Sequence, residues 1–157
     1  MDPLITTILP TYQRPAMLRR AIRSALAQSW TALQVRVYDN AGDPENAAVV
    51  ASLDDPRVEY FRHPRNLGAF ANFQFGLGRV STPFFSFLAD DDILLPDFYA
   101  TAMAALEKEP TAAFAAMRVV RGKATGMQKV ALPAGYLENL DDSTPLPGAD
   151  DDTGDGG

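Results

Sequence analysis

Strand-like runs that alternate with helix-like segments are the feature that most constrains the fold of this chain. Four runs rich in β-branched or aromatic residues predict strands at 4–9, 34–38, 57–61 and 84–88. Apolar residues at helical spacing predict helices at 15–28, 44–53, 69–79 and 97–108. We expect one further strand at 113–120. Strand and helix in repeated alternation, with short connections, predict an α/β fold with a mainly parallel sheet and flanking helices.

Periodicity also predicts which side chains face the core. The apolar stripe of the helix at 15–28 leaves three arginines largely off it, namely Arg19, Arg20 and Arg23. The helix at 69–79 is expected to turn inward Phe70, Phe73 and Leu77. The helix at 97–108 is expected to turn inward Phe98, Ala102, Ala105 and Leu106.

Length and charge distribution indicate one domain followed by a tail. The chain has 157 residues and is 46% hydrophobic, which is enough for one real core, and we place a single domain at 1–140. Residues 141–157 hold six of the 20 acidic residues and none of the 14 basic ones, so the domain itself carries 14 of each. This balance argues against a nucleic-acid partner. The tail has almost no apolar content, and we expect it to be disordered.

Several residue types that carry chemistry in other proteins are scarce or absent. Without cysteine, disulfides, thiolate metal sites and cysteine nucleophiles are excluded. The single histidine, His63, is expected to be a loop residue beside Pro64 rather than a catalyst. No apolar run reaches the roughly 18 residues that cross a bilayer, and the N-terminal residues do not resemble a signal peptide. The expected location is therefore cytoplasmic, with peripheral association with a membrane left open.

Polar side chains follow each predicted strand, at the edge where parallel α/β sheets bind ligands. Four loops meet there, at 10–14, 39–40, 62–66 and 90–92. Together they offer aromatic, hydrogen-bonding, basic and carboxylate groups, as a base, a ribose and a metal-bound diphosphate would require. The alternative is that these polar residues merely end the strands.

Asp90-Asp91-Asp92 comes directly after an aromatic strand and carries the strongest chemical signal. Three adjacent carboxylates repel one another, so a fold that aims them at one point usually supplies a cation. Oxygen ligands favour Mg²⁺ or Mn²⁺. The plain alternative is a solvated acidic turn, and that is how we interpret the second triplet, Asp150-Asp151-Asp152.

Four segments in this order and spacing resemble a known enzyme family. They are ITTILPTYQRPAMLRRAIRSALAQSW, VRVYDNAGD, FRHPRNLGAFANFQFGLG and TPFFSFLADDDILLPDF. Together they resemble the N-terminal, nucleotide-sugar-binding half of glycosyltransferase family 2, which has a GT-A (Rossmann-like) fold. The likeness covers roughly residues 4 to 110. It implies inverting transfer from a nucleoside-diphosphate sugar, with UDP-sugars favoured, assisted by Mn²⁺ or Mg²⁺. The acceptor, a saccharide, lipid or protein, is left open.

The resemblance also implies roles for individual residues. Thr11 and Tyr12, after Pro10, resemble the loop that packs on the base, and Asp39 resembles the carboxylate that hydrogen-bonds the pyrimidine. Asp90 matches the position facing the ribose. Asp91 matches the metal-binding aspartate of the DXD element, with Asp92 supporting that metal site directly or through water.

Four more positions have an expected role at the donor site, each with a structural alternative. Asn66 and Gly68 resemble the family's N-x-G element, although turn chemistry alone explains both. Arg14 is expected to bring a compensating positive charge, or else only to start a helix. Arg65 is expected either to contact a phosphate or to lie in solvent.

The departures from the family pattern concern catalysis. Phe73 stands where many relatives carry arginine, and Ala89 replaces the first aspartate of a common DxDD version. No general base can be assigned; Asp141 and Asp142 are candidates only by default. The alternative function is therefore an inactive, truncated nucleotide-sugar-binding module. A sugar-nucleotide pyrophosphorylase is disfavoured because residues 10–14 contain no glycine or lysine for a phosphate loop.

Overall fold

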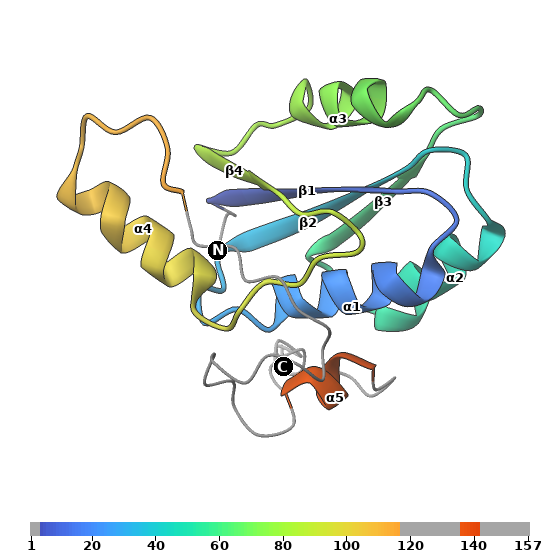
Figure 1. Cartoon of the computed structure of the whole chain (residues 1–157), viewed down its shortest axis with the longest axis horizontal. Coiled ribbons are helices and arrows are strands. Elements are labelled where there is room, and N and C mark those ends of the chain that lie inside the picture. Colours follow the sequence, from blue (N-terminus) through green and yellow to red (C-terminus); the bar gives the residue numbers. More distant parts are fainter. Residues whose placement is uncertain (1–3, 117–135, 142–157) are drawn as a thin grey trace, which may run out of the picture.

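The computed structural model describes residues 4–116 and 136–141, which form a sheet between helices (Figure 1). The strands are β1 (Ile5–Thr11), β2 (Leu33–Asp39), β3 (Val58–Arg62) and β4 (Phe84–Phe87). The helices are α1 (Pro15–Leu26), α2 (Pro44–Leu53), α3 (Ala69–Leu77), α4 (Phe98–Lys108) and α5 (Tyr136–Asp141). The predicted order of strands and helices is confirmed through residue 108. Residues 113–116 form no strand, and the rest of the strand predicted at 113–120 lies outside the described residues.

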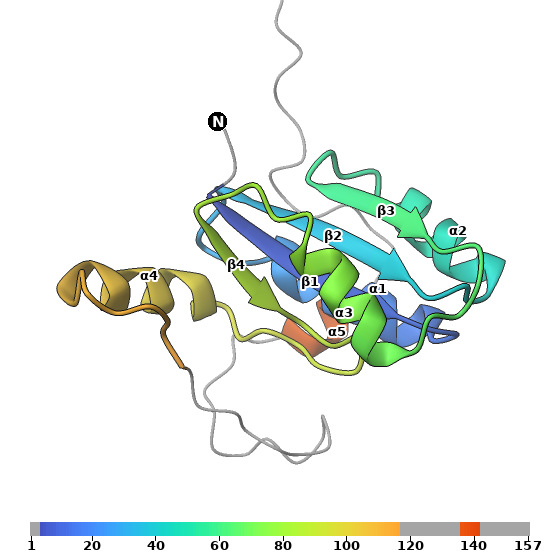
Figure 2. The ribbon, with the colours of Figure 1, turned by 90° about the horizontal axis from the view of Figure 1, so that it is seen from above.

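The four strands form one parallel sheet in the order β3-β2-β1-β4 (Figure 2). The register aligns Thr11 of β1 with Asp39 of β2, and Asp39 with Arg62 of β3. These three residues therefore end their strands at one level, as the carboxyl-edge argument requires. The predicted α/β class with a parallel sheet and flanking helices is confirmed.

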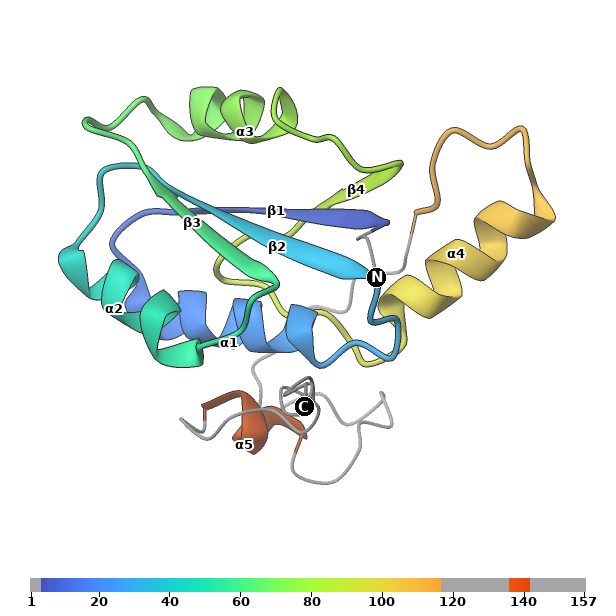
Figure 3. The same ribbon diagram turned by 180° about the vertical axis from the view of Figure 1, so that it is seen from behind.

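The sheet is covered on both faces, by α3 on one side and by α1 and α2 on the other (Figures 1 and 3). β1 lies in the interior of the sheet, so both of its faces are buried, which is why its sequence is apolar or β-branched throughout. The main core lies between the sheet and α1, and its fully buried members include Leu9, Leu18, Ile22, Val35 and Val37.

Helix α3 faces the sheet with a different side than predicted. Phe70 is 75% exposed and Leu77 is 43% exposed, so the expected inward stripe is wrong at both positions. The buried residues are Asn72 and Gly76. A Cβ atom on Gly76 would stand 2.7 Å from Cγ2 of Ile8 and 2.8 Å from the Tyr38 ring, so only glycine lets the helix approach this closely.

Helix α4 faces the core partly as predicted, since Phe98 and Leu106 pack against the core and Ala102 is half-buried. Tyr99 and Met103 are its buried residues, whereas Ala105 is exposed. The Tyr99 hydroxyl lies 2.6 Å from the hydroxyls of both Thr7 and Ser86, which ties α4 to β1 and β4.

In α1, the prediction that Arg23 lies largely off the buried stripe is wrong, because Arg23 is only 2% exposed.

Helix α5 packs on the outer side of α1, away from the sheet (Figures 1 and 3). Its Tyr136 hydroxyl donates to the Leu94 carbonyl at 2.6 Å, and Asp141 pairs with Arg20 at 3.1 Å. Residues 142–157, which make up nearly all of the predicted tail, lie outside the described residues. Within 4–116 and 136–141, no helix combines the length and apolar character needed to cross a membrane.

Candidate functional site

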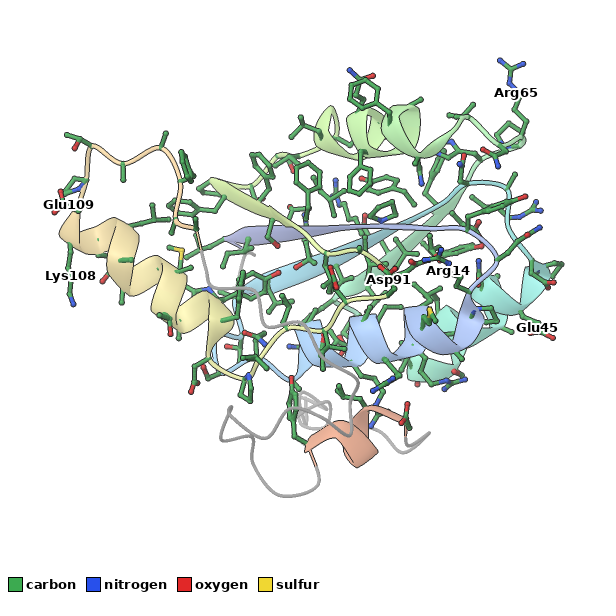
Figure 4. The ribbon with its side chains drawn as sticks, in the orientation of Figure 1. Arg14, Glu45, Arg65, Asp91, Lys108 and Glu109 are labelled. Atoms are coloured by element: carbon green, nitrogen blue, oxygen red, sulfur yellow. The ribbon has the colours of Figure 1, made fainter. Side chains whose placement is uncertain are left out.

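A compact group of polar side chains joins the ends of β1 and β4. The Thr11 hydroxyl donates to Oδ2 of Asp90 at 2.8 Å. Nη1 of Arg14 lies 3.1 Å from Oδ1 of Asp90 and 3.2 Å from Oδ2 of Asp91, so one guanidinium nitrogen bridges two carboxylates. Figure 4 shows Arg14 and Asp91 near each other at the carboxyl edge of the sheet. The structure thus brings together four of the residues predicted for the donor and metal sites.

The backbone after β1 has a left-handed turn just before Arg14. Gln13 has φ of 54°, a conformation that costs a non-glycine residue roughly 1–2 kcal/mol. Arg14 then takes the N-cap position of α1 without a capping hydrogen bond from its side chain, and Pro15 starts the helix. The Arg14 side chain is therefore not used in the cap, and it contacts the acidic turn instead.

The acidic turn has a buried end and an exposed end. Leu88 still donates a backbone hydrogen bond to the Ile8 carbonyl at 3.0 Å, which extends the line of β4 toward the turn. The side chain of Asp90 is 8% exposed and that of Asp91 is 54% exposed. Asp92 is exposed as well, and its backbone N–H donates to the Ala89 carbonyl.

The donor chemistry of this turn suits a hard divalent cation that is shared with a ligand. Asp90 and Asp91 already direct carboxylate oxygens at one positive nitrogen. Among the described residues no three acidic or imidazole side chains form a complete metal cage. Mg²⁺ and similar ions are commonly held by one or two carboxylates, with water and substrate phosphates as the other ligands. Two carboxylates therefore fit such an ion, provided that a diphosphate completes the site.

Asp39 lies at the same edge, but its carboxylate is buried and already accepts hydrogen bonds from the protein. It is fully buried, and its carboxylate accepts from the Gly42 backbone at 2.6 Å, from Nδ2 of Asn46 at 3.1 Å and from the Tyr60 hydroxyl at 2.5 Å. Burial, followed by the hydrogen bond to Asp39 and its negative charge, raises the pKa of Tyr60. Any base that donates to Asp39 has to join or replace one of these three donors.

Asparagine side chains connect β2 to the loop after β3. Oδ1 of Asn40 accepts from the Leu67 backbone at 2.7 Å, and Nδ2 of Asn40 donates to Oδ1 of Asn66 at 2.7 Å. The same Asn66 oxygen accepts from the Gly68 backbone at 2.8 Å, and Gly68 has φ of 83°. Asn66 and Gly68 thus form a turn that Asn40 holds at the carboxyl edge.

The remaining predicted residues lie at different depths around this edge. Pro10 is half-buried, and Tyr12 is 40% exposed, so its ring is accessible. Arg65 projects away from Arg14 and Asp91 (Figure 4). His63 is buried in its loop, and its Nε2 lies 2.9 Å from Oδ1 of Asn72.

Of the two residues named as default bases, Asp141 does not join this group. Asp141 pairs with Arg20 of α1, and α5 lies on the side of α1 that faces away from the sheet. Asp142 lies outside the described residues. Phe73, which stands at the family's arginine position, packs edge to face on Phe87, with ring centroids 5.3 Å apart.

Sequence reasoning missed Tyr60 and Asn46 as partners of Asp39. Tyr60 had been assigned only to a strand, and Asn46 only to a helix. A weak signal was present for Asn46, because it lies in the first turn of a helix that begins just after Asp39 and its turn. Tyr60 gave no comparable signal, since its contact depends on the pairing of β2 with β3.

Comparison with known proteins places these features in a family. The chain matches the family described as Glycosyl transferase family 2 over residues 6–151. A GalNAc(5)-diNAcBac-PP-undecaprenol beta-1,3-glucosyltransferase of Campylobacter jejuni is 35% identical over 104 residues, which are 64% of this chain and 34% of the relative. The succinoglycan biosynthesis protein ExoO of Rhizobium meliloti is 33% identical over 95 residues, covering 60% of this chain and 27% of that protein.

Solved structures show the same fold at low sequence identity. S. aureus TarS 1-349 in complex with UDP has a TM-score of 0.63 at 18% identity, covering 70% of this chain and 33% of that one. The mannosyltransferase PcManGT of Pyrobaculum calidifontis, in complex with GDP-Man and Mn²⁺, has a TM-score of 0.54 at 18% identity, covering 62% and 30%. The expected GT-A fold is confirmed, and the chain spans about a third or less of these relatives.

Proposed function

Because the chain belongs to glycosyl transferase family 2, we propose that it binds a nucleoside-diphosphate sugar at the carboxyl edge of its sheet, as the donor side of a metal-dependent, inverting glycosyltransferase. The observation that carries the proposal is the convergence of Thr11 and Arg14 on Asp90 and Asp91. This group combines a hydrogen-bonded carboxylate, an accessible carboxylate and a cation within the family's donor region.

The proposal assigns the nucleotide along the edge from the base to the diphosphate. The accessible ring of Tyr12, beside Pro10 and Thr11, offers a surface on which a uracil can stack. Asp90, held in place by Thr11, faces the ribose. UDP-sugars are the favoured donors, since one solved relative, S. aureus TarS 1-349, is described in complex with UDP and in complex with UDP-GlcNAc.

Asp39, Asn66 and Gly68 are proposed to complete the wall on the β2 side of the donor. A direct hydrogen bond from the base to Asp39 stays a prediction, and it requires an exchange with Tyr60 or a fourth hydrogen bond on Asp39. Asn66 and Gly68 are held beside Asp39 through Asn40, whose backbone N–H bonds to the Thr11 carbonyl.

Asp91, together with Asp90 or Asp92, is proposed to hold Mn²⁺ or Mg²⁺. When bound, such an ion neutralises the diphosphate and stabilises the charge that develops on it as it leaves. The protein's own part is to fix Asp90 through Thr11 and to present Asp91 to the ligand, because Asp91 is the more exposed of the two.

For the acceptor, we propose a lipid-linked saccharide as the class to test first. The Campylobacter relative is named for an undecaprenol-linked substrate. This choice fits a cytoplasmic protein that associates with the membrane surface, and sedimentation with vesicles containing anionic lipid would test that association.

The second candidate function is binding without turnover. It is favoured by the position of Asp141, whose carboxylate pairs with Arg20 on the far side of α1 and not with the acidic turn. A missing general base removes a factor of about a hundred to ten thousand from the rate. Incubation with radiolabelled UDP-sugars and lipid, saccharide and peptide acceptors would separate the two candidates, since robust metal-dependent transfer rejects binding alone.

Calorimetric titration with UDP, with and without Mn²⁺, tests the donor site. We expect weak binding without metal, because the diphosphate and the aspartates repel, and much tighter binding with it. Asp91→Ala should remove the metal enhancement, whereas Glu109→Ala, far from Asp91 in Figure 4, should leave it unchanged. No UDP binding under any condition rejects the proposed donor site, and metal-enhanced binding that survives Asp91→Ala rejects the role of Asp91.

A further inference from the structure

Arg14 forms the contacts that a bound cation would form. Its Nη1 atom lies 3.1 Å from Oδ1 of Asp90 and 3.2 Å from Oδ2 of Asp91. The other Asp90 oxygen accepts from Thr11 at 2.8 Å. Both Asp90 oxygens and one Asp91 oxygen therefore have donors in the protein alone, and the positive charge that offsets the two aspartates comes from the chain itself.

The guanidinium and a divalent ion cannot share this position. Both are positive, both seek the same carboxylate oxygens, and like charges a few ångströms apart repel strongly wherever water is partly excluded. Asp90 is held firmly, since its side chain is 8% exposed and bonded to Thr11. The Arg14 side chain is 50% exposed, so the guanidinium is the partner that can move at low cost.

We infer that Arg14 is an internal counter-ion of the acidic turn, which the metal ion displaces and which then pairs with the diphosphate. The inference rests on the proposed donor function and adds a mechanism to it. In the metal-free protein Arg14 prevents repulsion between Asp90 and Asp91. When the metal ion takes over these carboxylates, the guanidinium is released beside the same site, where a phosphate is its natural bidentate partner.

This exchange makes metal and nucleotide binding cooperative. The metal alone binds weakly because it has to break the ion pairs of Arg14, and the diphosphate alone finds Arg14 already paired. A bound metal ion frees Arg14 for the diphosphate, and a diphosphate that holds Arg14 frees the carboxylates for the metal ion. Each ligand therefore raises the affinity for the other, and the coupling is reciprocal. Coupling energies of this kind typically correspond to a change of about 5- to 150-fold in affinity.

Titrations of the full chain and of Arg14→Met, which keeps an unbranched stem and removes the charge, test the inference. Mn²⁺ binding is measured by electron paramagnetic resonance, with and without UDP. We expect Arg14→Met to bind Mn²⁺ alone about tenfold more tightly than the unmodified chain, with most of the coupling to UDP lost. Lys108→Met removes a cation far from the turn (Figure 4) and should change neither quantity.

Thermal unfolding gives a second readout that needs no nucleotide. Without metal, Arg14→Met should melt at a lower temperature than the unmodified chain, because two carboxylates lose their cation, and Mn²⁺ should raise its melting temperature more. Arg14→Lys keeps one charge and should be intermediate in both assays. It also serves as the test variant if Arg14→Met does not fold.

The possible results separate this inference from the proposed function. Unchanged or weaker Mn²⁺ binding by Arg14→Met, with the coupling to UDP intact, overturns the exchange while the metal-dependent donor site stands. If no variant binds Mn²⁺ even with UDP present, the metal-dependent donor site and the exchange are both rejected.

Discussion

Asp39→Asn is the substitution that best separates structural support from base recognition. Three donors converge on this buried carboxylate, namely the Gly42 N–H, the Asn46 amide and the Tyr60 hydroxyl. An asparagine keeps the shape but replaces one oxygen by NH₂. If the NH₂ replaces Oδ1 it faces the Gly42 N–H, and if it replaces Oδ2 it faces the Asn46 amide. In the first orientation two donors face each other. In the second the Asn46 amide has to rotate so that its Oδ1, which has no hydrogen-bond partner among the described residues, accepts, and the Tyr60 hydroxyl has to accept where it now donates.

The magnitude follows from these contacts. Hydrogen bonds to a charged group contribute about 1.5–3 kcal/mol each, and a buried donor left unsatisfied costs about 1–3 kcal/mol. Because the amide oxygen still accepts some of these bonds, we expect Asp39→Asn to lower the free energy of unfolding by about 3 kcal/mol. Tyr60→Phe removes a single donor and should cost roughly half as much.

Urea unfolding followed by circular dichroism measures both variants and their double mutant. UDP affinity is measured in parallel, at a temperature where every variant is folded. The reasoning is refuted if Asp39→Asn stays within about 1 kcal/mol of the unmodified chain. If such a stable variant also loses most of its UDP affinity, the carboxylate is free to bind the base, as the family resemblance implies.

Three further predictions concern other parts of the molecule. Gly76→Ala should destabilise the fold by about 1–3 kcal/mol in urea unfolding, because its Cβ would meet Ile8 and Tyr38, while Gly78→Ala, with its nearest contact at 3.5 Å, should be close to neutral. Gly42→Ala should lower the free energy of unfolding in the same assay and should weaken UDP binding, since its Cβ would stand 2.6 Å from Oδ1 of Asp39. An unchanged free energy of unfolding would count against the tight turn at Gly42. Burial raises the pKa of Tyr136 to about 12, whereas the unfolded chain has a tyrosine pKa of about 10. The contribution of neutral Tyr136 to the free energy of unfolding is therefore complete below about pH 10 and is lost as the pH rises from about 10 to 12. Tyr136→Phe should therefore flatten the alkaline decline in unfolding midpoints, and an unchanged decline would contradict the burial of Tyr136.

The sequence predicted the order of the strands and helices because each strand is a short β-branched or aromatic run with clear boundaries. It failed on the inward face of α3, and in α4 it was wrong at Ala105 and missed the buried Tyr99 and Met103. Helix α3 carries no charged residue and has aromatic residues on several sides, so periodicity did not single out an inward face. The close approach at Gly76 decides that face, and it depends on Ile8 and Tyr38, which are distant in the chain.

The position of the candidate site was predictable, but the individual partnerships were not. Parallel strands bring their carboxyl ends to one edge, which placed Thr11, Asp39 and the acidic turn together. An aspartate at the end of a strand gives the same sequence signal whether it binds a ligand or holds its own turn. Only the pairing of β2 with β3, which brings Tyr60 to Asp39, distinguishes a buried carboxylate of this kind.

The strand order also sets when the site can form as the chain is made. β1 leaves the ribosome first, yet one of its two neighbours is β4, and the Thr11–Asp90 hydrogen bond spans 79 positions of sequence. Contacts between such distant residues form slowly, because a long loop has to close first. Nucleotide or metal binding at the acidic turn therefore requires that β4 has already paired with β1, which is a late step of folding. A nascent chain that stops before residue 84 can pair β1 with β2, but it contains only one half of the site.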